Sequence, residues 1–463
     1  MDLNRSGELN LARGLRLHPP DKNPAYRNLR VAFTGAGGKT TALFQVARQL
    51  PPPVLVTAST HLGRSQLSLA DRHFSILTSE DLAAQTVRLF EGVVLFTGPG
   101  DGGERTIGLD LAILERLDGL ASFIGAPLLV EADGSRRLPL KAPAEHEPAI
   151  PPFSNLVVVV AGMSGIGKRL DEGTVHRPER FSTLSGLGIG ERLDDLAVVR
   201  VLLHPMGGLK GFPDNARRTV LLNQADQPEQ VDLASRMAEK LLEGYSSVLV
   251  ASLGGSDPIV HAVHEKTAGV ILAAGGSSRL GAPKQLLGWH GIPFVRHVAR
   301  RALDAGLAPV VVVTGAYAQE VERALEGLDV QLTHNADWEL GQSSSVHAGV
   351  RAIPSENGSA IFLLSDQPQV PERLLQELVQ AHARSLAPIV APRVQGKRAS
   401  PVLFDASVFP ELLLLQGDTG GRVLFSDRER FPLKWVDWDD ASLLLDVDTP
   451  QDYQRLISLE LEP

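Results

Sequence analysis

The stretch Val270-Ile-Leu-Ala-Ala-Gly275-Gly-Ser-Ser-Arg279-Leu-Gly281-Ala-Pro-Lys284 governs the interpretation of the second half of this chain. Its first residues are small or β-favouring and apolar, which is typical of a buried strand in a parallel sheet. The glycines then allow backbone N–H groups to approach an anion closely, because glycine has no Cβ. Arg279 and Lys284 add positive charge, which favours a triphosphate. The stretch fits neither GxxxxGK[ST] nor GxGxxG, and a tight turn with two solvated cations is the alternative.

Length and composition predict two or three α/β domains. The chain has 463 residues, 43% of them hydrophobic and only 5% aromatic, which favours aliphatic cores. Its formal net charge of −9 argues against a general affinity for nucleic acid. The absence of cysteine excludes disulfides, thiolate zinc sites and a cysteine nucleophile in this chain. The sequence has no signal-peptide pattern and no apolar run long enough to span a membrane, so we expect a cytoplasmic protein without a membrane partner.

Alternating apolar and helix-compatible segments predict two doubly wound α/β units. Residues 28–258 are expected to form a P-loop-like parallel sheet, and residues 268–463 a Rossmann-like unit of the GT-A type. We expect a loose tail over residues 1–27 and a linker over residues 259–267. The expected strands are 29–33, 54–57, 93–97, 128–131, 156–161, 220–223 and 248–252 in the first unit, and 270–274, 310–314, 361–365, 389–391 and 402–404 in the second.

A second glycine-rich loop, Phe33-Thr-Gly35-Ala-Gly37-Gly38-Lys39-Thr40-Thr41, follows an expected strand and opens an expected helix. This is the context that a P-loop requires, so the glycines are candidates for surrounding a phosphate. Lys39 would reach the outer phosphates of ATP or GTP, and Thr40 would ligate Mg²⁺. Phe33 replaces the first glycine of the pattern, which leaves a non-nucleotide anion or a structural turn as alternatives.

The segment Leu128-Leu-Val-Glu131-Ala-Asp133-Gly134 is expected to be a buried strand that ends in two carboxylates. Glu131 and Asp133 could hold Mg²⁺ or orient water, as a Walker B carboxylate does; solvated acids in a turn are the alternative. Arg136, Arg137 and Lys141 follow, so acids and cations would meet as in a metal–phosphate site. Asn223-Gln-Ala-Asp226 resembles the NKxD motif of GTPases only weakly, because Asn and Asp after a strand usually make a turn.

Four stretches of the first half resemble the YqeC-like family, whose members are accessory proteins of selenium-dependent molybdenum hydroxylases. They are Thr34 to Thr41, Glu131 to Pro143, Glu145-His146-Glu147-Pro148 and Val175-His176-Arg177-Pro178-Glu179. The resemblance covers about residues 28–255 and implies a molybdenum hydroxylase apoprotein as a partner, but not a reaction. We expect His146 and His176 near the site, although a hydrogen-bonded structural role for each is equally consistent with the sequence.

Five stretches of the second half, in order, resemble the MobA-like nucleotidyltransferases over about residues 268–456. They are the opening loop, 313–316, Asn335 with 341–345, 364–368 and 446–450. The resemblance implies that Arg279, Lys284 and Asp366 are catalytic and that Asp366 and Asp448 hold Mg²⁺. Asp446 lies two residues before Asp448 and could serve in its place. The implied nucleotide-binding residues are Leu272, Ala273, Ala274, Gly275, Gly276, Ser277, Gly315, Asn335 and Ser343.

Within that family, Ala273-Ala274-Gly275 resembles the cytidylyltransferase branch, whereas the guanylyltransferase branch usually has Ala-Gly-Gly. Residues 366–368 and 417–422 also fit the cytidylyl branch, but Ala399-Ser400 replaces the Gly-His that usually precedes the following proline. The implied reaction transfers CMP from CTP to Mo-molybdopterin and releases pyrophosphate, with Mg²⁺ as cofactor. A guanylyl- or sugar-nucleotidyltransferase and a non-catalytic cofactor carrier remain alternatives.

Overall fold

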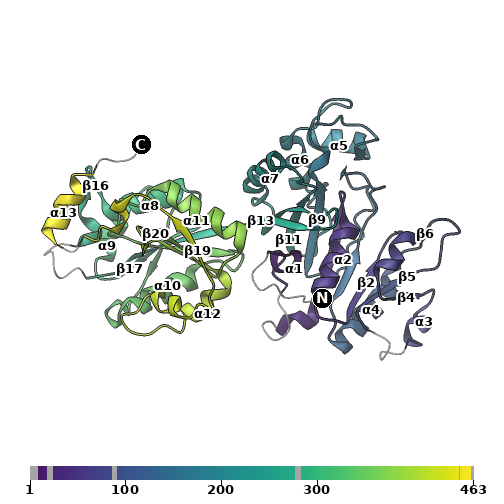
Figure 1. Ribbon diagram of the computed structural model, residues 1–463, viewed down its shortest axis with the longest axis horizontal. Coiled ribbons are helices and arrows are strands. Elements are labelled where there is room, and N and C mark those ends of the chain that lie inside the picture. The colour runs from purple at the N-terminus through teal and green to yellow at the C-terminus, as the bar shows by residue number, and fades with distance from the viewer. Residues whose placement is uncertain (1–8, 18–23, 86–90, 277–282, 448, 460–463) are drawn as a thin grey trace. The chain divides into compact units, whose positions relative to one another are not determined.

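Runs of buried valine and leucine form the strands of two separate sheets, one in each of two units. The computed structural model describes residues 9–17, 24–85, 91–276, 283–447 and 449–459. The chain divides into Met1–His264 and Glu265–Pro463, each with its own sheet and flanking helices (Figure 1). No helix within the described residues is long and apolar enough to cross a membrane. The predicted α/β architecture of two units built on parallel strands is confirmed.

The N-terminal unit contains a nine-stranded sheet whose inner strands pair in parallel. Its strands, in sheet order, are β13 (Ile259–Glu265), β12 (Ser247–Ser252), β11 (Arg217–Asn223), β9 (Leu156–Gly162), β1 (Arg30–Gly35), β7 (Leu128–Glu131), β2 (Val54–Ala58), β5 (Val93–Thr97) and β4 (Arg72–Ser75). The helices are α1 (Leu11–Gly14), α2 (Lys39–Gln49), α3 (Ser79–Ala83), α4 (Leu111–Ile124), α5 (Pro178–Ser185), α6 (Asp195–Leu203) and α7 (Pro228–Leu241). Two short pairs, β3 (Leu62–Gly63) with β6 (Arg105–Thr106) and β8 (Leu140–Lys141) with β10 (Val175–His176), lie outside the sheet.

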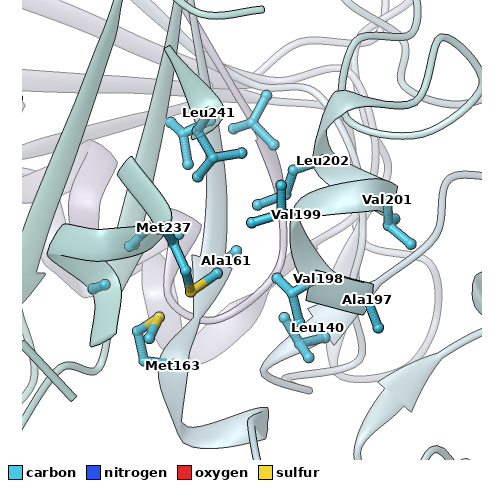
Figure 2. Packing of buried hydrophobic residues seen from close by; sticks show 14 of the residues in the cluster. Leu140, Ala161, Met163, Ala197, Val198, Val199, Val201, Leu202, Met237 and Leu241 are labelled. Carbon is cyan, nitrogen blue, oxygen red and sulfur yellow. The ribbon is translucent and has the colours of Figure 1, made fainter. Parts of the chain in front are cut away.

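The core of the N-terminal unit forms where apolar helix faces cover the sheet. Figure 2 shows Met237 and Leu241 of α7 facing Val198 and Leu202 of α6, with Ala161 of β9 between them. Each buried valine or leucine of this kind contributes roughly 1.5–3 kcal/mol. A second cluster packs α3 and α4 against the strands β2, β5 and β7. The two clusters cover different parts of the sheet, one over β9, β11 and β12 and the other over β2, β5 and β7.

The expected tail and linker both contain ordered elements. Helix α1 packs into the N-terminal unit, because Leu11 and Leu15 are buried and Gly14 lies against Leu249 and Val263. The expectation of a loose tail is therefore wrong for residues 11–17. Strand β13 extends the nine-stranded sheet, so residues 259–265 are not an irregular linker. With its polar histidines and glutamate, β13 has the sequence of a half-exposed edge strand, and that pattern resembles the pattern of a loop.

The C-terminal unit contains an eight-stranded mixed sheet. Its strands are β18 (Gln331–His334), β17 (Val310–Thr314), β14 (Thr267–Ala273), β19 (Ser359–Leu364), β22 (Val402–Asp405), β20 (Ile389–Val394) and β21 (Lys397–Arg398), with β23 (Leu433–Asp437) paired to β20. The helices are α8 (Phe294–Asp304), α9 (Ala318–Ala324), α10 (Gln342–Ala352), α11 (Glu372–Ser385), α12 (Phe409–Leu412) and α13 (Pro450–Ile457). A hairpin of β15 (Gly288–Trp289) and β16 (Ile292–Pro293) precedes α8.

Strand β14 shows how both faces of this sheet are covered. Ile271 and Ala273 pack into a core with α8 and α11, whereas Ala268 and Val270 pack into a core with α10 and α12 (Figure 1). Successive side chains of a strand point to opposite faces, so an uninterrupted apolar run is the pattern expected of a strand buried on both sides.

The expected strands 389–391 and 402–404 exist, but β22 is antiparallel to both β19 and β20. A short hairpin through β21 connects β20 to β22, and the turn at Gln395 and Gly396 has positive φ at both residues. So short a connection can only reverse the chain, because a parallel return needs a crossover of a dozen or more residues. Strand β20 is still parallel to β19 and is joined to it by α11, so the doubly wound pattern ends at β20 and β22 is inserted between the two.

We predict that Leu15→Ala destabilises the N-terminal unit by about 2–5 kcal/mol, because it opens a cavity under α1. The matched control is Leu77→Ala at a side chain that is 69% exposed, which is expected to cost about 0.5 kcal/mol or less. Urea unfolding followed by far-UV circular dichroism measures both effects. All four tryptophans lie beyond residue 288, so tryptophan emission reports the C-terminal unit separately. Equal effects of the two substitutions would contradict the packing of α1.

Candidate functional site

In the N-terminal unit, the carboxyl ends of neighbouring parallel strands meet at one edge of the sheet. The registers place Phe33 beside Glu131, Glu131 beside Ala58, and Asn223 beside Gly162. The glycine-rich loop after β1, the acidic loop after β7 and the loop after β11 therefore lie together. Ligands of open α/β sheets bind at this edge.

The glycines of the loop after β1 are required by close contacts within the protein. Gly35, Gly37 and Gly38 have φ of 92°, 81° and 118°. A Cβ on Gly35 would lie 2.2 Å from the Val160 carbonyl oxygen, and one on Gly37 would lie 2.4 Å from the Gly162 nitrogen. No side chain fits at such distances. The structural-turn alternative thus explains the glycines, and they do not by themselves indicate a phosphate.

Lys39 lies in the first turn of α2, and its ammonium group is held by protein atoms. Nζ donates hydrogen bonds to the Gly35 carbonyl oxygen at 2.7 Å and to Ser135 Oγ at 3.1 Å, and it lies 3.3 Å from Asp133 Oδ1. Its side chain is only 3% exposed. A phosphate at this position would have to replace one of these partners or bind beside them.

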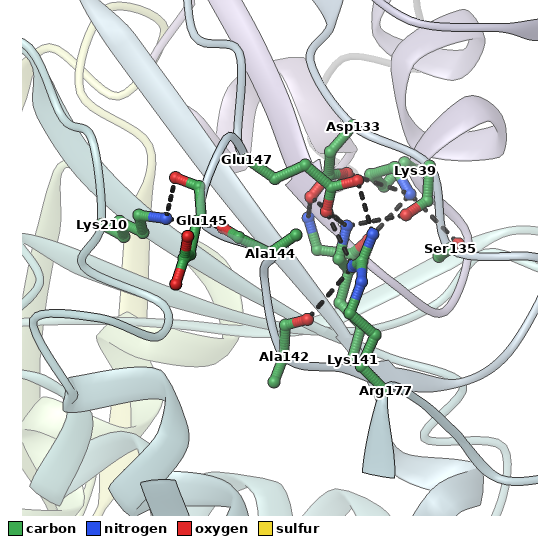
Figure 3. A network of polar contacts seen from close by, with 12 residues as sticks. Lys39, Asp133, Ser135, Lys141, Ala142, Ala144, Glu145, Glu147, Arg177 and Lys210 are labelled. Carbon is green, nitrogen blue, oxygen red and sulfur yellow. Dashed lines mark hydrogen bonds and ion pairs between the residues drawn. The ribbon is translucent and has the colours of Figure 1, made fainter. Parts of the chain in front are cut away.

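A chain of alternating charges runs from Asp133 toward the start of α5 (Figure 3). Lys141 Nζ donates to Asp133 Oδ2 and to Glu147 Oε2, each at 2.8 Å. Arg177 binds both oxygens of Glu147 at 2.9 Å, a bidentate arrangement. Burial alone would raise the pKa of Glu147, but the hydrogen bonds from Arg177 and Lys141 outweigh it and hold the pKa at about 2.

Thr40 and Glu131 form a hydroxyl–carboxylate pair at the start of α2. Thr40 Oγ1 donates to Glu131 Oε2 at 2.7 Å, and Glu131 is almost fully buried. Burial raises the pKa of Glu131, and the charge of Lys39 and the hydroxyl of Thr40 oppose this only in part. Both groups are hard oxygen donors of the kind that Mg²⁺ prefers. Asp133, the third predicted ligand, instead has each carboxylate oxygen next to a lysine.

The remaining predicted residues of this edge have defined places. Asn223 Nδ2 donates to the Gly37 carbonyl oxygen at 2.7 Å, and Asn223 Oδ1 accepts from the Leu253 N–H at 3.0 Å, so this amide ties loops together. His146 and His176 both line a cleft beside the charge chain. Burial, reinforced by nearby cations, lowers the pKa of His176 to about 4, so its imidazole is neutral at physiological pH.

In the C-terminal unit, the parallel strands β14, β17 and β19 end at one edge of the sheet. The registers pair Ala273 with Thr314 and Leu272 with Leu364. Beyond β14, the Gly275 carbonyl oxygen accepts a hydrogen bond from Gln285 Nε2 at 3.1 Å. This bond fixes the first residue of the opening loop, 275–284, which is the signature loop of the MobA-like motif. Leu272 is partly buried, and Ala273 and Ala274 are buried.

Trp338 explains two of the glycines in this region. A Cβ on Gly276 would lie 3.0 Å from Trp338 Cζ3, and one on Gly315 would lie 2.9 Å from Trp338 Cβ and 2.6 Å from the Ala274 carbonyl oxygen. The indole of Trp338 therefore packs against the loop at Gly276 and its Cβ against Gly315, and a larger residue at Gly315 would separate these segments.

Lys284 and Asp366, which are 82 positions apart in the chain, lie side by side at this edge. Lys284 Nζ is 3.7 Å from Asp366 Oδ2, with side chains 16% and 34% exposed. A partly exposed lysine and carboxylate at the ends of adjacent elements can meet a charged ligand. The predicted residues Ser277, Arg279 and Asp448 lie outside the described residues.

Asn335 and Ser343 are buried in the loop and helix start that follow β18. Asn335 Nδ2 donates to Ser344 Oγ at 2.8 Å and Ser345 Oγ at 3.0 Å, and its Oδ1 accepts from the Asp337 N–H at 3.0 Å. The amide is thus engaged within the protein and positions the start of α10. Direct contact between this amide and a base would require these bonds to change.

Relatives with known sequences match each unit separately. The model of the YqeC protein family matches residues 31–179, and that of the MobA-like NTP transferase domain matches residues 269–431. The uncharacterized protein YqeC of Escherichia coli (strain K12) is 30% identical over 218 residues, which cover 46% of this chain and 82% of that protein. The N-terminal unit belongs to the YqeC family.

The relatives of the second unit include an oxidoreductase and a cytidylyltransferase by name. The nicotine blue oxidoreductase of Paenarthrobacter nicotinovorans is 33% identical, over 41% of this chain and 95% of that protein. The molybdenum cofactor cytidylyltransferase of Escherichia coli (strain K12) is 24% identical, over 39% of this chain and 92% of that protein. The C-terminal unit is a MobA-like NTP transferase domain, and the protein is a nucleotidyltransferase fused to a YqeC unit.

Several contacts at the two sites involve residues to which the sequence motifs assign no role. In the YqeC unit, Glu147 and Arg177 lie in stretches that resemble the YqeC-like family. The motifs do not indicate that Glu147 contacts both Lys141 and Arg177. In the transferase unit, Gln367 Nε2 donates to Asp446 Oδ1 at 2.8 Å and joins the loop after β19 to the C-terminal segment. Gln367 lies within the motif stretch 364–368, but the motif does not indicate its contact with Asp446, and Trp338 lies outside the motif stretches.

We predict that Glu147→Gln lowers the melting temperature of the YqeC unit at about pH 7, because it removes the charge bound by Lys141 and Arg177. The pKa of Glu147 lies below the ordinary value of 4.5, at about 2 in the folded chain. Its charge therefore stabilises the fold above about pH 4.5, and this stabilisation is lost as the pH falls toward 2.

The difference between wild type and Glu147→Gln should accordingly be large at about pH 7 and shrink below about pH 4.5, as measured by thermal circular dichroism. Glu145→Gln is the matched control in the same loop. The Glu145 side chain is exposed, and Lys210 binds only its backbone oxygen. A difference that stays constant with pH would show that the charge of Glu147 is not responsible.

Proposed function

We propose that the C-terminal unit is a molybdenum cofactor cytidylyltransferase, which transfers CMP from CTP to the terminal phosphate of Mo-molybdopterin and releases pyrophosphate. The observation that carries this proposal is the pair Lys284 and Asp366, held 3.7 Å apart at the carboxyl edge of the sheet. The family of the unit, the 24% identical relative of that name and the tripeptide Ala273-Ala274-Gly275 support it.

In this reaction an oxygen of the acceptor phosphate forms a bond to the α-phosphorus of CTP. The bond from that phosphorus to the bridging oxygen breaks, and its electron pair leaves with pyrophosphate. The attacking oxygen is already negatively charged, so no strong base is required. The protein must instead align the two phosphates and stabilise the charge on the leaving group.

The residues of this chain fit those demands. Lys284, with Arg279, would bind the β- and γ-phosphates and stabilise the pyrophosphate as it leaves. The carboxylate of Asp366 is partly exposed at the strand edge, and with Asp448 it offers the hard oxygen donors that suit Mg²⁺. When bound, that ion would offset negative charge on the phosphate oxygens. Gln285 would hold the signature loop in place through its bond to Gly275.

Two alternatives make different predictions for the same assay. A guanylyl- or sugar-nucleotidyltransferase would also release pyrophosphate, but with GTP or a sugar phosphate. A carrier or chaperone of the finished cofactor would bind it without releasing pyrophosphate. The pair Lys284 and Asp366 favours a transferase over a carrier, because a pure carrier has no need of a site for a metal–triphosphate.

We further propose that the YqeC unit acts beside the transferase during maturation of a molybdenum hydroxylase in the cytoplasm, with ATP or GTP as its candidate ligand. Selenium-dependent hydroxylases are the partner class that the family implies. The hydroxyl–carboxylate pair of Thr40 and Glu131, at the start of a helix that follows a buried strand, supports a nucleotide and Mg²⁺ there.

We predict that the purified chain releases pyrophosphate with CTP, Mg²⁺ and Mo-molybdopterin, and that Asp366→Asn lowers this rate by about 100-fold or more. Asp304→Asn removes an exposed carboxylate at the end of α8 and is the control, with no expected effect. GTP and ATP are compared with CTP. Release with GTP alone would assign the guanylyl branch, and no release with any nucleotide would refute a transferase.

We predict that Thr40→Val weakens Mg²⁺-dependent binding of ATP or GTP by about 10-fold or more, the scale of losses at metal sites. The measurement is equilibrium dialysis with labelled ATP or GTP. Excess unlabelled CTP occupies the transferase site, so the label reports binding to the YqeC unit. Thr40→Ser keeps the hydroxyl and should retain binding, and Thr41→Val changes the exposed neighbour without effect. Equal binding by Thr40→Val and wild type would exclude Thr40 as part of a nucleotide site.

A further inference from the structure

A cleft of about 790 Å³ opens in the YqeC unit beside the charge chain of Figure 3. Loops after β2 and β7, the strand β6 and the segment from β10 to α5 form its walls. Its lining includes Thr60, Arg105, Arg136, His146, His176 and Arg177. Lys39 and the glycines of the loop after β1 are not part of the lining, so the cleft is distinct from the candidate nucleotide loop. It lies at the sheet edge where α/β proteins bind ligands.

Three guanidinium groups line this cleft, and two of them are not engaged elsewhere. Arg177 is bound to Glu147, whereas the side chains of Arg105 and Arg136 have no hydrogen-bond or ion-pair partner among the described residues. Arg136 and Arg177 have φ of 51° and 68°, a region that residues other than glycine, asparagine and aspartate rarely adopt. This backbone conformation is shared by Arg137, which does not line the cleft, so it does not by itself mark a binding site.

Neutral hydrogen-bonding groups accompany the arginines. His176 is uncharged at physiological pH, because burial and the charges of Arg177, Lys141 and Arg136 lower its pKa to about 4. A neutral imidazole can both donate and accept a hydrogen bond. Thr60 Oγ1 is buried without a hydrogen-bond partner among the described residues, so its hydroxyl can bind a ligand without losing an internal bond.

We propose that this cleft binds a phosphorylated small molecule, with Arg105 and Arg136 on the phosphate oxygens and Thr60 and His176 as hydrogen-bonding neighbours. Guanidinium groups present paired N–H donors whose spacing matches two phosphate oxygens. This site is separate from the transferase site, and the proposal does not depend on transferase activity.

The acidic residues of the cleft narrow the ligand class further. Glu147 is neutralised by Lys141 and Arg177, but Glu172 and Glu179 also line the cleft. Carboxylates accept hydrogen bonds and repel a second phosphate, so they suit hydroxyl or amine groups on the rest of the molecule. The ligand is therefore a phosphate ester of a compound that carries hydroxyl or amine groups.

The test is site-resolved modification of arginine by phenylglyoxal in the full chain, read by mass spectrometry, with glycerol 2-phosphate as the probe and EDTA present. Arg105 and Arg136 are exposed and accessible to the reagent. The probe is expected to slow their modification several-fold and saturably. The adjacent Arg137 is exposed, has a similar φ of 62° and does not line the cleft, so its rate should not change. Glycerol with sodium chloride at equal ionic strength should protect neither residue.

The matched variants Arg136→Gln and Arg137→Gln test whether two arginines share one ligand. Arg136→Gln should weaken the protection of Arg105, whereas Arg137→Gln should leave it unchanged. The proposal is overturned if the probe protects none of these arginines, if it protects Arg137 as much as Arg136, or if Arg105 stays equally protected in Arg136→Gln. Pyrophosphate release by the C-terminal unit is measured separately, so the two proposals can fail independently.

Discussion

A strand can lie parallel to its neighbour only after the chain has crossed back along the sheet, so the carboxyl ends of parallel strands gather at one edge. In the YqeC unit this edge holds the loop after β1 together with Glu131 and Asn223. In the transferase unit it holds the ends of β14, β17 and β19, and this brings Lys284 to Asp366. Both candidate sites depend on this constraint, because their residues are far apart in sequence.

The charge chain of the YqeC unit shows what it costs to place ionic groups at such an edge. Asp133 and Lys141 are nearly inaccessible, and removing one partner from a buried pair typically costs about 3–5 kcal/mol. Alternation of sign offsets the desolvation of each group. Lys39, Asp133, Lys141 and Glu147 are therefore needed to keep the loops in place. Their burial alone does not identify a binding role, whereas the exposed arginines of the cleft have no such structural duty.

The sequence predicts the fold of both units better than it predicts the roles of individual site residues. Strand positions, the two-unit architecture and the families were predictable, because buried parallel strands are continuous apolar runs and the motifs follow them. The roles of individual residues were less accessible. Glycine is required after β1 because a side chain there would clash with the backbone of Val160 and Gly162. The Asn335 amide already donates hydrogen bonds to Ser344 and Ser345. A motif gives the residue type and its place in a loop. The same residue type can be required by contacts within the protein or by contacts with a ligand, and the motif does not distinguish the two.

The sequence by itself determined the α/β class, the strand ends that carry polar residues and the relation to the YqeC and MobA-like families, since these follow from local pattern. The tertiary structure alone decided which side chains meet: Lys284 with Asp366, Glu147 with Lys141 and Arg177, and Arg105 with Arg136 around one cleft. It also decided that β13 joins the sheet and that β22 runs antiparallel. Such contacts depend on strand order, and strand order is set by packing across the whole sheet rather than by neighbours in the chain.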